Sequence, residues 1–369
     1  MDIISKLKEA GLKGCGGASY PVADKWQAVK DAFGPIKYVI CNASEGEPNV
    51  FKDAYILKNW PEKVIDGMVA AMDFLKEHEV QVEGYIFINP EYDKKFGWFL
   101  AREIQKRKAS IRLHQGSGGQ IGIYVKPEDG GYICGEETTI LNTMEGNKSE
   151  PRLKPPFPTE KGLWGMPTII NNVETFYHAA KIAEGDYETV RFYSVNGDCA
   201  NPGVYKLSDH KSIQHVIAET RNWPKYDFFV QVGGGSAGEI LNQHQLDAMP
   251  TGAMSITLYR TSEWTCRDLF RHWIGFFLTE SCGQCVPCRE ATYRLYETIN
   301  ASQSRDRDRD GAPDWKLFFD LLDDLSETSF CGLGLSVPTA IRSYIKNVLL
   351  NKKLQVKDNN KELILKFFE

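Results

Sequence analysis

Three cysteines spaced three residues apart are the side chains of this sequence best suited to hold a metal centre. Cys282, Cys285 and Cys288 form a C-x-x-C-x-x-C run within ESCGQCVPCREATYRL. Thiolates at this spacing let a tight loop wrap one metal centre, and a [4Fe-4S] cluster takes four of them. Cys331, in the glycine-rich stretch TSFCGLGLSVP, is the best fourth ligand, because backbone N–H groups there can point at sulfide and a helix follows.

Two alternatives to this ligand set are open at the level of sequence. Cys266 competes with Cys331, but it shares an apolar helical stripe with Phe270 and Trp273, where buried structural thiols usually lie. Zinc also accepts four cysteines, although zinc sites more often pair two C-x-x-C knuckles. Three close cysteines with a remote fourth are typical of iron–sulfur proteins, so we expect a [4Fe-4S] cluster.

A glycine-rich loop near the N-terminus could cradle a phosphate. Gly14, Gly16 and Gly17 precede a helical run in GLKGCGGASYPVADKW. Glycines allow positive φ and close approach of the backbone to a ligand, and the helix start offers N–H groups to an anion. Lys25 could add a positive charge. A glycine turn before a helix is also common without a ligand, so this motif alone decides little.

Acidic and amide side chains follow the predicted strands of the same region. Asn42, Glu45 and Glu47 come directly after an apolar run, and ligands of open α/β sheets bind beyond the carboxyl ends of strands. Further polar motifs supply Gly130, Gly131, Gly135, Glu136, Glu137, Lys154, Phe157, Asn171 and Asn172. Together they suit a large planar cofactor with a polar tail. The seven histidines carry no motif, and no Ser-His-Asp or Cys-His arrangement stands out.

The composition excludes several classes of protein. The chain has 369 residues, of which 42% are hydrophobic and 25% charged, so it is globular and long enough for two or three domains. A net charge of −5 argues against a general nucleic-acid binder. No segment approaches the roughly 20 apolar residues of a membrane span, and the N-terminus lacks the apolar core of a signal peptide. We therefore expect a cytoplasmic protein without direct membrane insertion, whose thiols stay reduced and available to a metal.

Hydrophobic patterns divide the chain into three segments. In residues 1–180, the runs at 38–42 and 85–89 predict buried strands around a helix at 60–77, hence a parallel sheet. The polar stretch 116–167 is long for a loop and should be functional. Residues 181–262 read as a small α+β module: a strand, a turn and a helix, then a strand, a glycine turn and a short helix, then a last strand. Residues 263–369 predict a helical bundle, with a solvated charged loop at 303–315.

These motifs together resemble the flavin subunit of respiratory complex I and of NAD-linked hydrogenases and formate dehydrogenases. The family pattern G-x-x-G-R-G-G-A-G-F-P-x-x-x-K-W is close to residues 11–26, and N-A-D-E-x-E-P-x-x-x-K-D to residues 42–53. Y-I-C-G-E-E-T-A and E-P-R-L-K-P-P-F-P are matched at 132–139 and 150–158. G-L-W-G-x-P-T-x-x-N-N-V-E-T and S-C-G-x-C-x-P-C-R-x-G are matched at 162–175 and 281–291. The resemblance spans almost the whole chain in the same order.

The resemblance implies a fold, cofactors and site residues. The fold would be an α/β Rossmann-like flavin domain (1–180), a β-grasp, ubiquitin-like module (181–262) and a helical bundle with one [4Fe-4S] cluster (263–369). FMN and NAD(H) would contact Gly14, Gly16, Gly17, Tyr20, Lys25, Asn42, Ser44, Glu45, Glu47, Tyr132, Gly135, Glu136, Glu137, Lys154, Phe157, Ile170, Asn171 and Asn172. The cluster ligands would be Cys282, Cys285, Cys288 and Cys331.

The chain departs from the family pattern mainly around the expected nicotinamide pocket. Cys15 stands in place of the family Arg, Ser19 in place of a Gly, and Tyr20 in place of a Phe. Ser44 replaces an Asp, and an aromatic residue expected shortly after Trp26 is missing. Some relatives have a thioredoxin-like or a ferredoxin-like extension, and the part of the family that this chain resembles includes neither. We therefore expect a thioredoxin-like [2Fe-2S] subunit and a further iron–sulfur or catalytic subunit as partners.

The implied function is that of an NADH dehydrogenase subunit in a multisubunit oxidoreductase. NAD(H) would exchange hydride with FMN, and single electrons would then pass through the [4Fe-4S] cluster to partner subunits, with Glu45 and Glu137 near the flavin and no catalytic acid or base. Carboxylates of Glu45 and Glu47 near the ribose would repel a 2′-phosphate and favour NADH over NADPH. The alternatives are flavin-based electron bifurcation, use of NADPH, an electron relay that no longer binds NAD(H), and a purely structural subunit. Membrane association through a larger complex is also open.

Overall fold

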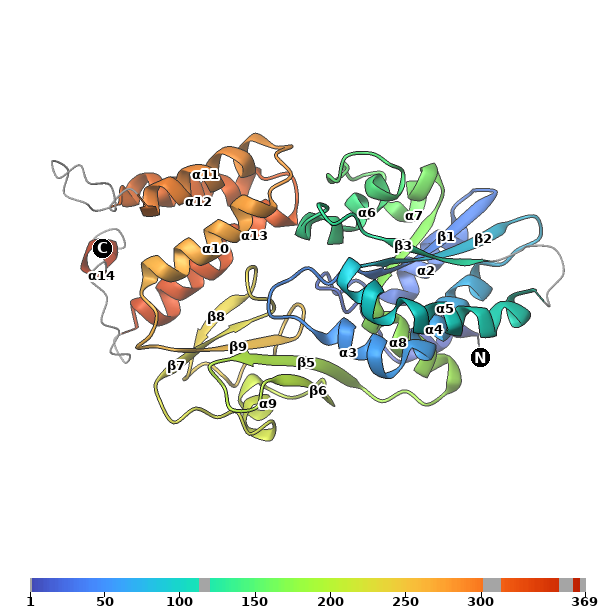
Figure 1. Ribbon diagram of the computed structural model, residues 1–369, viewed down its shortest axis with the longest axis horizontal. Coiled ribbons are helices and arrows are strands. Elements are labelled where there is room, and N and C mark those ends of the chain that lie inside the picture. The colour runs from blue at the N-terminus through green and yellow to red at the C-terminus, as the bar shows by residue number, and fades with distance from the viewer. Residues whose placement is uncertain (1, 113–119, 301–312, 352–360, 366–369) are drawn as a thin grey trace. The chain divides into compact units, whose positions relative to one another are not determined.

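The computed structural model describes residues 2–112, 120–300, 313–351 and 361–365 (Figure 1). It has a mixed α/β fold with a parallel sheet and a helical C-terminal region. The chain divides into two compact units, the first made of Met1–Gly46 and Phe51–Phe192, the second of Glu47–Val50 and Tyr193–Glu369. The division into three domains stays a prediction.

A four-stranded parallel sheet forms the centre of the first unit. Its strands are β1 (Ile36–Ala43), β2 (Gln81–Ile88), β3 (Ile121–Val125) and β4 (Thr168–Asn172), in the order β3-β2-β1-β4. Five consecutive residues of β1, 37–41, are buried, as expected for a strand covered on both faces. The strands predicted at 38–42 and 85–89 and their parallel arrangement are confirmed. Strand β3 falls in the stretch 116–167, which the sequence predicted as a loop.

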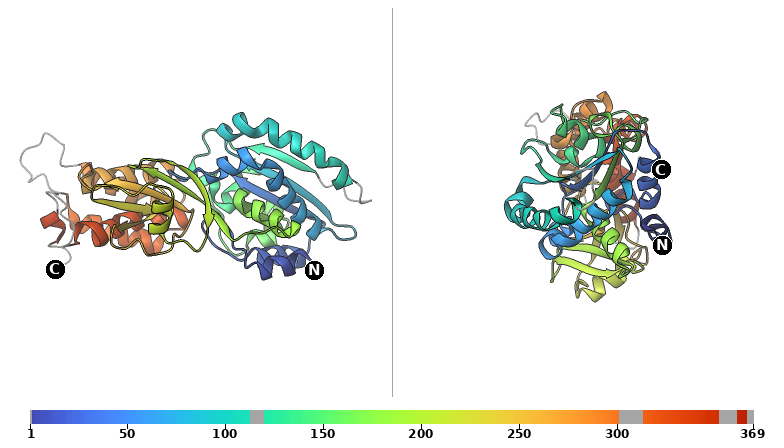
Figure 2. Two further views of the ribbon diagram at one scale, coloured as in Figure 1. Left: turned by 90° about the horizontal axis from the view of Figure 1, so that it is seen from below. Right: turned by 90° about the vertical axis from the view of Figure 1, so that its right-hand side faces the viewer.

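Helices cover both faces of this sheet (Figure 1; Figure 2). One face carries α4 (Pro61–Leu75) and α8 (Val173–Glu184), which pack closely because Gly67 has no side chain: a Cβ there would lie 1.9 Å from the carbonyl oxygen of Phe176. The other face carries α6 (Glu137–Met144), whose Ile140, Leu141 and Met144 share a core with Tyr38 and Ile40. The helix predicted at 60–77 is confirmed.

Further helices and two 3-10 turns complete the first unit. They are α1 (Ile3–Glu9), α2 (Val22–Asp31), α3 (Lys52–Asn59), α5 (Pro90–Arg112), α7 (Pro158–Lys161) and the 3-10 turns η1 (Tyr132–Gly135) and η2 (Leu163–Gly165). Helix α2 begins after the glycines of the N-terminal loop, α3 begins at the end of the Asn42–Asp53 motif, and α6 begins just after Gly135. The polar motifs of the sequence therefore sit at helix starts.

A five-stranded mixed sheet lies mainly in the second unit. Its strands are β5 (Val190–Gly197), β6 (Gly203–Ser208), β7 (Phe228–Val232), β8 (Glu239–Asn242) and β9 (Ser255–Arg260), in the order β6-β5-β9-β7-β8, with α9 (Ile213–Glu219) between β6 and β7. The segment 239–242 was predicted as a short helix, and this is wrong. It pairs antiparallel with β7 across the glycine turn, and its other edge is satisfied by side chains: Ser343 Oγ accepts from Ile240 N (2.8 Å), and Asn347 Nδ2 donates to Ile240 O (2.7 Å).

The helical C-terminal region follows the sheet. Its helices are α10 (Cys266–Glu280), α11 (Val286–Asn300), α12 (Trp315–Thr328), α13 (Gly332–Tyr344), the π-turn η4 (Ile345–Leu349) and α14 (Lys361–Leu365). Cys266, Phe270 and Trp273 are fully buried, as their apolar stripe predicted. Most of the predicted charged loop 303–315 lies outside the described residues. Within the described residues, none of the helices is long and apolar enough to cross a membrane.

Candidate functional site

The structure brings the four predicted cluster cysteines together. Cys282 and Cys285 lie in the turn between α10 and α11, Cys288 lies in the first turn of α11, and Cys331 immediately precedes α13. Gly283 shapes the turn with a φ of +75°, which most side chains disfavour. The first turn of α13 packs against the first turn of α11, because a Cβ on Gly334 would lie 3.3 Å from Cys288 Cβ.

Electrostatic coupling among the four thiols follows from their proximity. Burial raises the pKa of Cys288 to about 11, and the neighbouring thiols of Cys285, Cys331 and Cys282 act in the same direction, while a contact with Ser281 lowers it. Burial likewise raises the pKa of Cys331, opposed by the backbone N–H groups of Leu333 and Gly334. These two N–H groups belong to the start of α13, where the helix dipole favours a thiolate.

Four cysteines match the ligand set of a [4Fe-4S] cluster, which is bound by four thiolates. Zinc also accepts four cysteines, so the ligand set alone does not decide between the two centres.

A second set of polar groups lies at the carboxyl edge of the parallel sheet. Asn42 and Asn172 face each other in register at the ends of β1 and β4, and Ile170 and Asn171 precede Asn172. The Asn42 side chain donates to Gly135 O (2.9 Å), which fixes the Gly135 turn over the sheet. Trp26 Nε1 lies 2.8 Å from the Asn171 side-chain amide, whose oxygen is placed to accept from it. The strands thus hold the amides at the edge where ligands of such sheets bind.

Ser44 and Gly135 form a cradle at this edge. The Ser44 hydroxyl is fully buried and has no hydrogen-bond partner in the described structure. A Cβ on Gly135 would lie 3.1 Å from that hydroxyl, so the glycine backbone passes close to Ser44. A buried hydroxyl without a partner is suited to a bound polar ligand.

The glycine loop lies beside the same edge. Gly14 N donates to Tyr20 O (2.9 Å), and this bond closes the loop. A Cβ on Gly16 would lie 3.3 Å from Asn172 Cβ, so the loop passes close to the end of β4. Gly17 has a φ of +114° and is exposed, which leaves its backbone accessible to a ligand. The structure therefore unites the glycine loop with the asparagine edge.

Two lysines neutralise the paired acids of the Gly135 motif. Lys154 Nζ lies 3.0 Å from carboxylate oxygens of both Glu136 and Glu137, and Lys25 Nζ lies 3.6 Å from Glu137. Although burial raises the pKa of Glu137, the two lysines outweigh it and lower that pKa below its ordinary value. Glu137 is therefore ionised at neutral pH. Glu136 caps α6 by accepting from Thr138 N and Thr139 N, both at 2.9 Å.

Glu45 accepts hydrogen bonds from the first turn of α3. Its carboxylate accepts from Asp53 N (2.7 Å), Ala54 N (3.1 Å) and Tyr92 Oη (2.7 Å). Burial and then the charge of Asp53 raise the pKa of Glu45 to about 8, in spite of these donors. Its backbone has a φ of +25°, an uncommon conformation for a side-chain-bearing residue. A role for Glu45 at a ribose stays a prediction.

Glu47 belongs to the second unit and already has partners there. Its carboxylate accepts from Ser236 N (2.9 Å) and Ala237 N (3.2 Å) in the glycine turn between β7 and β8. The predicted aromatic residues Tyr20 and Phe157 are half-exposed in the first unit, and Tyr132 packs against Gly46. Their proposed contacts with a ring stay predictions.

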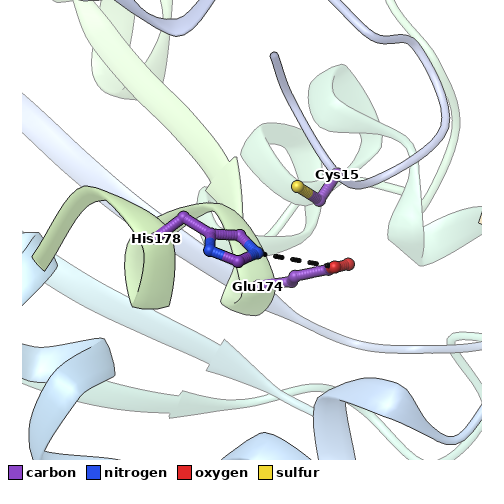
Figure 3. Close-up of side chains that lie close together, drawn as sticks. All are labelled: Cys15, Glu174 and His178. Atoms are coloured by element: carbon purple, nitrogen blue, oxygen red, sulfur yellow. Dashed lines mark ion pairs between the residues drawn. The ribbon is translucent and has the colours of Figure 1, made fainter. Parts of the chain in front are cut away.

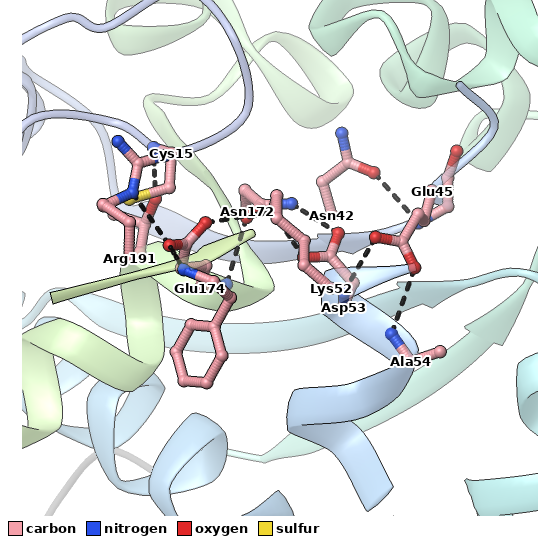
Figure 4. Close-up of polar contacts among 12 residues, drawn as sticks. Cys15, Asn42, Glu45, Lys52, Asp53, Ala54, Asn172, Glu174 and Arg191 are labelled. Atoms are coloured by element: carbon pink, nitrogen blue, oxygen red, sulfur yellow. Dashed lines mark hydrogen bonds and ion pairs between the residues drawn. The ribbon is translucent and has the colours of Figure 1, made fainter. Parts of the chain in front are cut away.

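A buried network of charges beneath this edge was not singled out by sequence reasoning (Figure 4). Lys52 Nζ bonds Asp53 Oδ1 (2.7 Å) and Asn172 Oδ1 (2.8 Å), and lies 3.3 Å from Glu174 Oε2. Glu174 Oε1 accepts from Arg191 Nε at 2.8 Å. Burial alone would lower the pKa of Lys52, but the surrounding carboxylates raise it. The network holds Asn172 in place. In the sequence, the network is marked by the adjacent charged residues Lys52 and Asp53 within the family-like stretch 42–53.

Comparisons with known proteins agree with both sites. Residues 7–181 match the family model described as the Nuo51 FMN-binding domain, and residues 268–348 match the NADH-ubiquinone oxidoreductase-F iron-sulfur binding region. The F subunit of NADH-quinone oxidoreductase in Aquifex aeolicus is 32% identical over 370 residues, covering 94% of this chain and 84% of the relative. This chain belongs to the family of NADH-quinone oxidoreductase F subunits. The predicted resemblance is confirmed.

Relatives of these F subunits also occur in hydrogenases. NAD-reducing hydrogenase HoxS subunit alpha of Cupriavidus necator is 33% identical over 371 residues, covering 92% of this chain but 58% of the relative. The crystal structure of an NAD+-reducing [NiFe]-hydrogenase in the H2-reduced state matches with a TM-score of 0.83 and 27% identity, over 96% of this chain and 63% of that chain. The chain therefore spans about three fifths of these hydrogenase chains. The four-cysteine site and the sheet edge fall in the two matched regions.

Proposed function

We propose that the chain is the NADH-oxidising flavin subunit of a multisubunit oxidoreductase. It exchanges hydride with NAD(H) through FMN and passes electrons to partner subunits through a [4Fe-4S] cluster. The observation that carries this proposal is the presence of two cofactor-type sites on one chain: the glycine and asparagine edge in the first unit, and the four-cysteine site in the second. Bound flavin supplies the means to take two electrons at once and release them singly.

We propose that the first unit is a Rossmann-like flavin domain and that the five-stranded sheet is a β-grasp module. The residues that would hold FMN are the glycine loop, Asn42, Asn171, Asn172 and Ser44, at the carboxyl edge of β1 and β4. The unpartnered Ser44 hydroxyl beside Gly135 supports this placement, because it has hydrogen-bonding capacity that no described residue uses.

In this proposal, the protein residues position the cofactors and neutralise the charges around them. Lys25 donates to Ile170 O at 3.1 Å, so its charge is fixed at the sheet edge, and Lys154 holds Glu136 and Glu137. Since Glu137 stays ionised at neutral pH, it can accept hydrogen bonds from a ligand but cannot act as an acid. Tyr20 and Phe157, half-exposed, are available to stack on the rings of a nicotinamide cofactor.

The preference for NADH over NADPH is proposed to depend on Glu45 and Glu47, whose negative charges would repel a 2′-phosphate. Because the pKa of Glu45 is raised to about 8, its share of this repulsion would grow as the pH rises toward that value. The variants Glu45→Gln and Glu47→Gln test each carboxylate with little change of shape. An unchanged ratio of NADH to NADPH activity in both variants contradicts this role. Since Glu47 bonds Ser236 N and Ala237 N, its variant also needs a thermal-unfolding control.

We propose a thioredoxin-like [2Fe-2S] subunit and a further iron–sulfur or catalytic subunit as partners. The cluster must pass its electrons on, and three of its four cysteines, Cys282, Cys285 and Cys331, are only half-buried. Membrane association, where it occurs, would come through such partners in a larger complex.

An anaerobic absorbance titration of the purified chain tests the function. FMN and iron are quantified first, and NADH, NADPH and dithionite are added in turn. We expect NADH to bleach the flavin band. Bleaching by dithionite alone selects the electron-relay alternative, which the replacement of the family Asp by Ser44 favours. Bleaching by NADPH alone contradicts the ribose argument. A chain with full iron but no flavin contradicts the whole proposal and leaves a structural subunit.

A further inference from the structure

Three buried metal-binding side chains lie together in the first unit, and the proposed cofactor contacts do not use them (Figure 3). A sulfur of Cys15, a carboxylate oxygen of Glu174 and a ring nitrogen of His178 all lie within 4.8 Å of one another. Each side chain is exposed by 1% or less. A thiolate, a carboxylate and an imidazole are the three ligand types that zinc takes in proteins.

The backbone fixes all three side chains. Glu174 and His178 are four residues apart on α8, so they project from one face of the helix. The loop that carries Cys15 is tied to the same helix, since Cys15 N donates to Thr175 Oγ1 at 2.9 Å. The cluster is therefore formed by two segments held in register by a hydrogen bond outside the ligand set.

His178 has unsatisfied bonding capacity. Neither of its ring nitrogens has a hydrogen-bond partner among the described residues, although Nε2 lies 3.7 Å from Glu174 Oε1. The aromatic rings of Tyr177, Tyr187 and Phe192 surround the imidazole. A buried polar group left without a partner costs about 1–3 kcal/mol. A metal bond to one nitrogen removes part of that cost.

We propose that Cys15, Glu174 and His178 bind one zinc ion, with a water or a backbone oxygen as the fourth ligand. The zinc–sulfur bond forms as the thiol releases its proton to solvent, and no electron is transferred. The ion ties the glycine loop to α8. This inference does not depend on the proposed function, because it concerns groups that neither flavin nor nicotinamide contacts in that proposal.

Zinc content and zinc X-ray absorption of the protein that holds FMN and its cluster test the site. The protein is dialysed against zinc, freed of excess metal and analysed for zinc and iron. We expect about one zinc per chain with iron unchanged, in a shell of one sulfur at about 2.3 Å and nitrogen or oxygen atoms at about 2.0–2.2 Å. Absence of retained zinc, or a shell of four sulfurs from the cluster cysteines, overturns the proposal.

Matched variants locate the ion. Cys15→Ser and His178→Asn should each lower zinc affinity at least about tenfold, because even residues behind the direct ligands cost that much. Cys199→Ser removes a half-buried thiol elsewhere and should retain zinc. Equal retention in Cys15→Ser and Cys199→Ser overturns the assignment. If a variant fails to fold, the sulfur count in the absorption spectrum of the unaltered protein still decides. Flavin bleaching by NADH is measured on the same samples, so failure of the function is seen separately.

Discussion

Lys52 supplies the sharpest test of the buried network that supports the sheet edge. Its side chain is 2% exposed and lies between the buried carboxylates of Asp53 and Glu174. Lys52→Met keeps the length and apolar character of the side chain but removes the cation. Both carboxylates then lose a partner while buried, and removing one member of a buried ion pair costs about 3–5 kcal/mol.

The expected effect is large on the thermal scale. For a unit of this size each kcal/mol shifts the Tm by about 2–4 °C, so Lys52→Met should lower it by roughly 6–20 °C. Lys63→Met is the matched control, because Lys63 pairs with Glu184 at a partly exposed position of the same unit. Such surface pairs contribute about 0–1 kcal/mol, so its Tm should fall by no more than about 4 °C.

Differential scanning calorimetry with a parallel FMN assay measures both effects. Since Lys52 also bonds Asn172 Oδ1, the Lys52→Met variant should lose FMN as well as stability. Equal, small shifts for the two variants would refute the reasoning. A large loss of stability with full FMN content would show that the network supports the fold but not the flavin edge.

Three further predictions concern the cysteine site and Glu45. Cys331→Ala should abolish the iron content and keep FMN, whereas Cys266→Ala, at a buried structural thiol, should keep both; loss of iron in the second variant alone would reverse the ligand assignment. Gly334→Ala should destabilise the cysteine loop by about 1–3 kcal/mol, because its Cβ would lie 2.4 Å from Ser329 Oγ, while Gly332→Ala, which meets no atom within 4 Å, should be near neutral in chemical denaturation. Because the pKa of Glu45 is raised from 4.5 to about 8, the unfolded chain loses this proton first, and stability should fall as pH rises between those values. Glu45→Gln should flatten that slope by up to about 1.4 kcal/mol per pH unit in urea unfolding, and identical slopes would contradict the raised pKa.

Local patterns sufficed to predict the main strands and helix of the first unit and the four cysteines that the structure brings together. Short apolar runs predict strands β1 and β2, and helical spacing of apolar residues predicts α4. The glycines around Cys331 predict a turn before a helix. Strand β8 was missed, because Ser343 and Asn347, about a hundred residues away, satisfy its outer edge and no local pattern encodes them.

Contacts between distant segments account for the other differences. Asn172 was predicted as a ligand of FMN, but the ion pairs beneath it join residues 52, 174 and 191, which no periodicity connects. Glu47 and Glu45 are two residues apart and were predicted to act together. The sequence did not predict that N–H groups of the β7–β8 turn would donate to the Glu47 carboxylate. Cys15 lies in the glycine-loop motif and His178 in no motif, and the fold brings their side chains close to Glu174.

Low-temperature electron paramagnetic resonance of the anaerobic protein tests the central claim most directly. Excess NADH is added to the chain with its FMN and cluster, and the signal of the reduced [4Fe-4S] centre is compared with that given by dithionite. The account predicts that NADH produces the signal in the unaltered chain and not in Cys331→Ala, although flavin bleaching persists in both. A cluster that stays oxidised under a large excess of NADH, while dithionite reduces it, would contradict electron transfer from NADH through this chain.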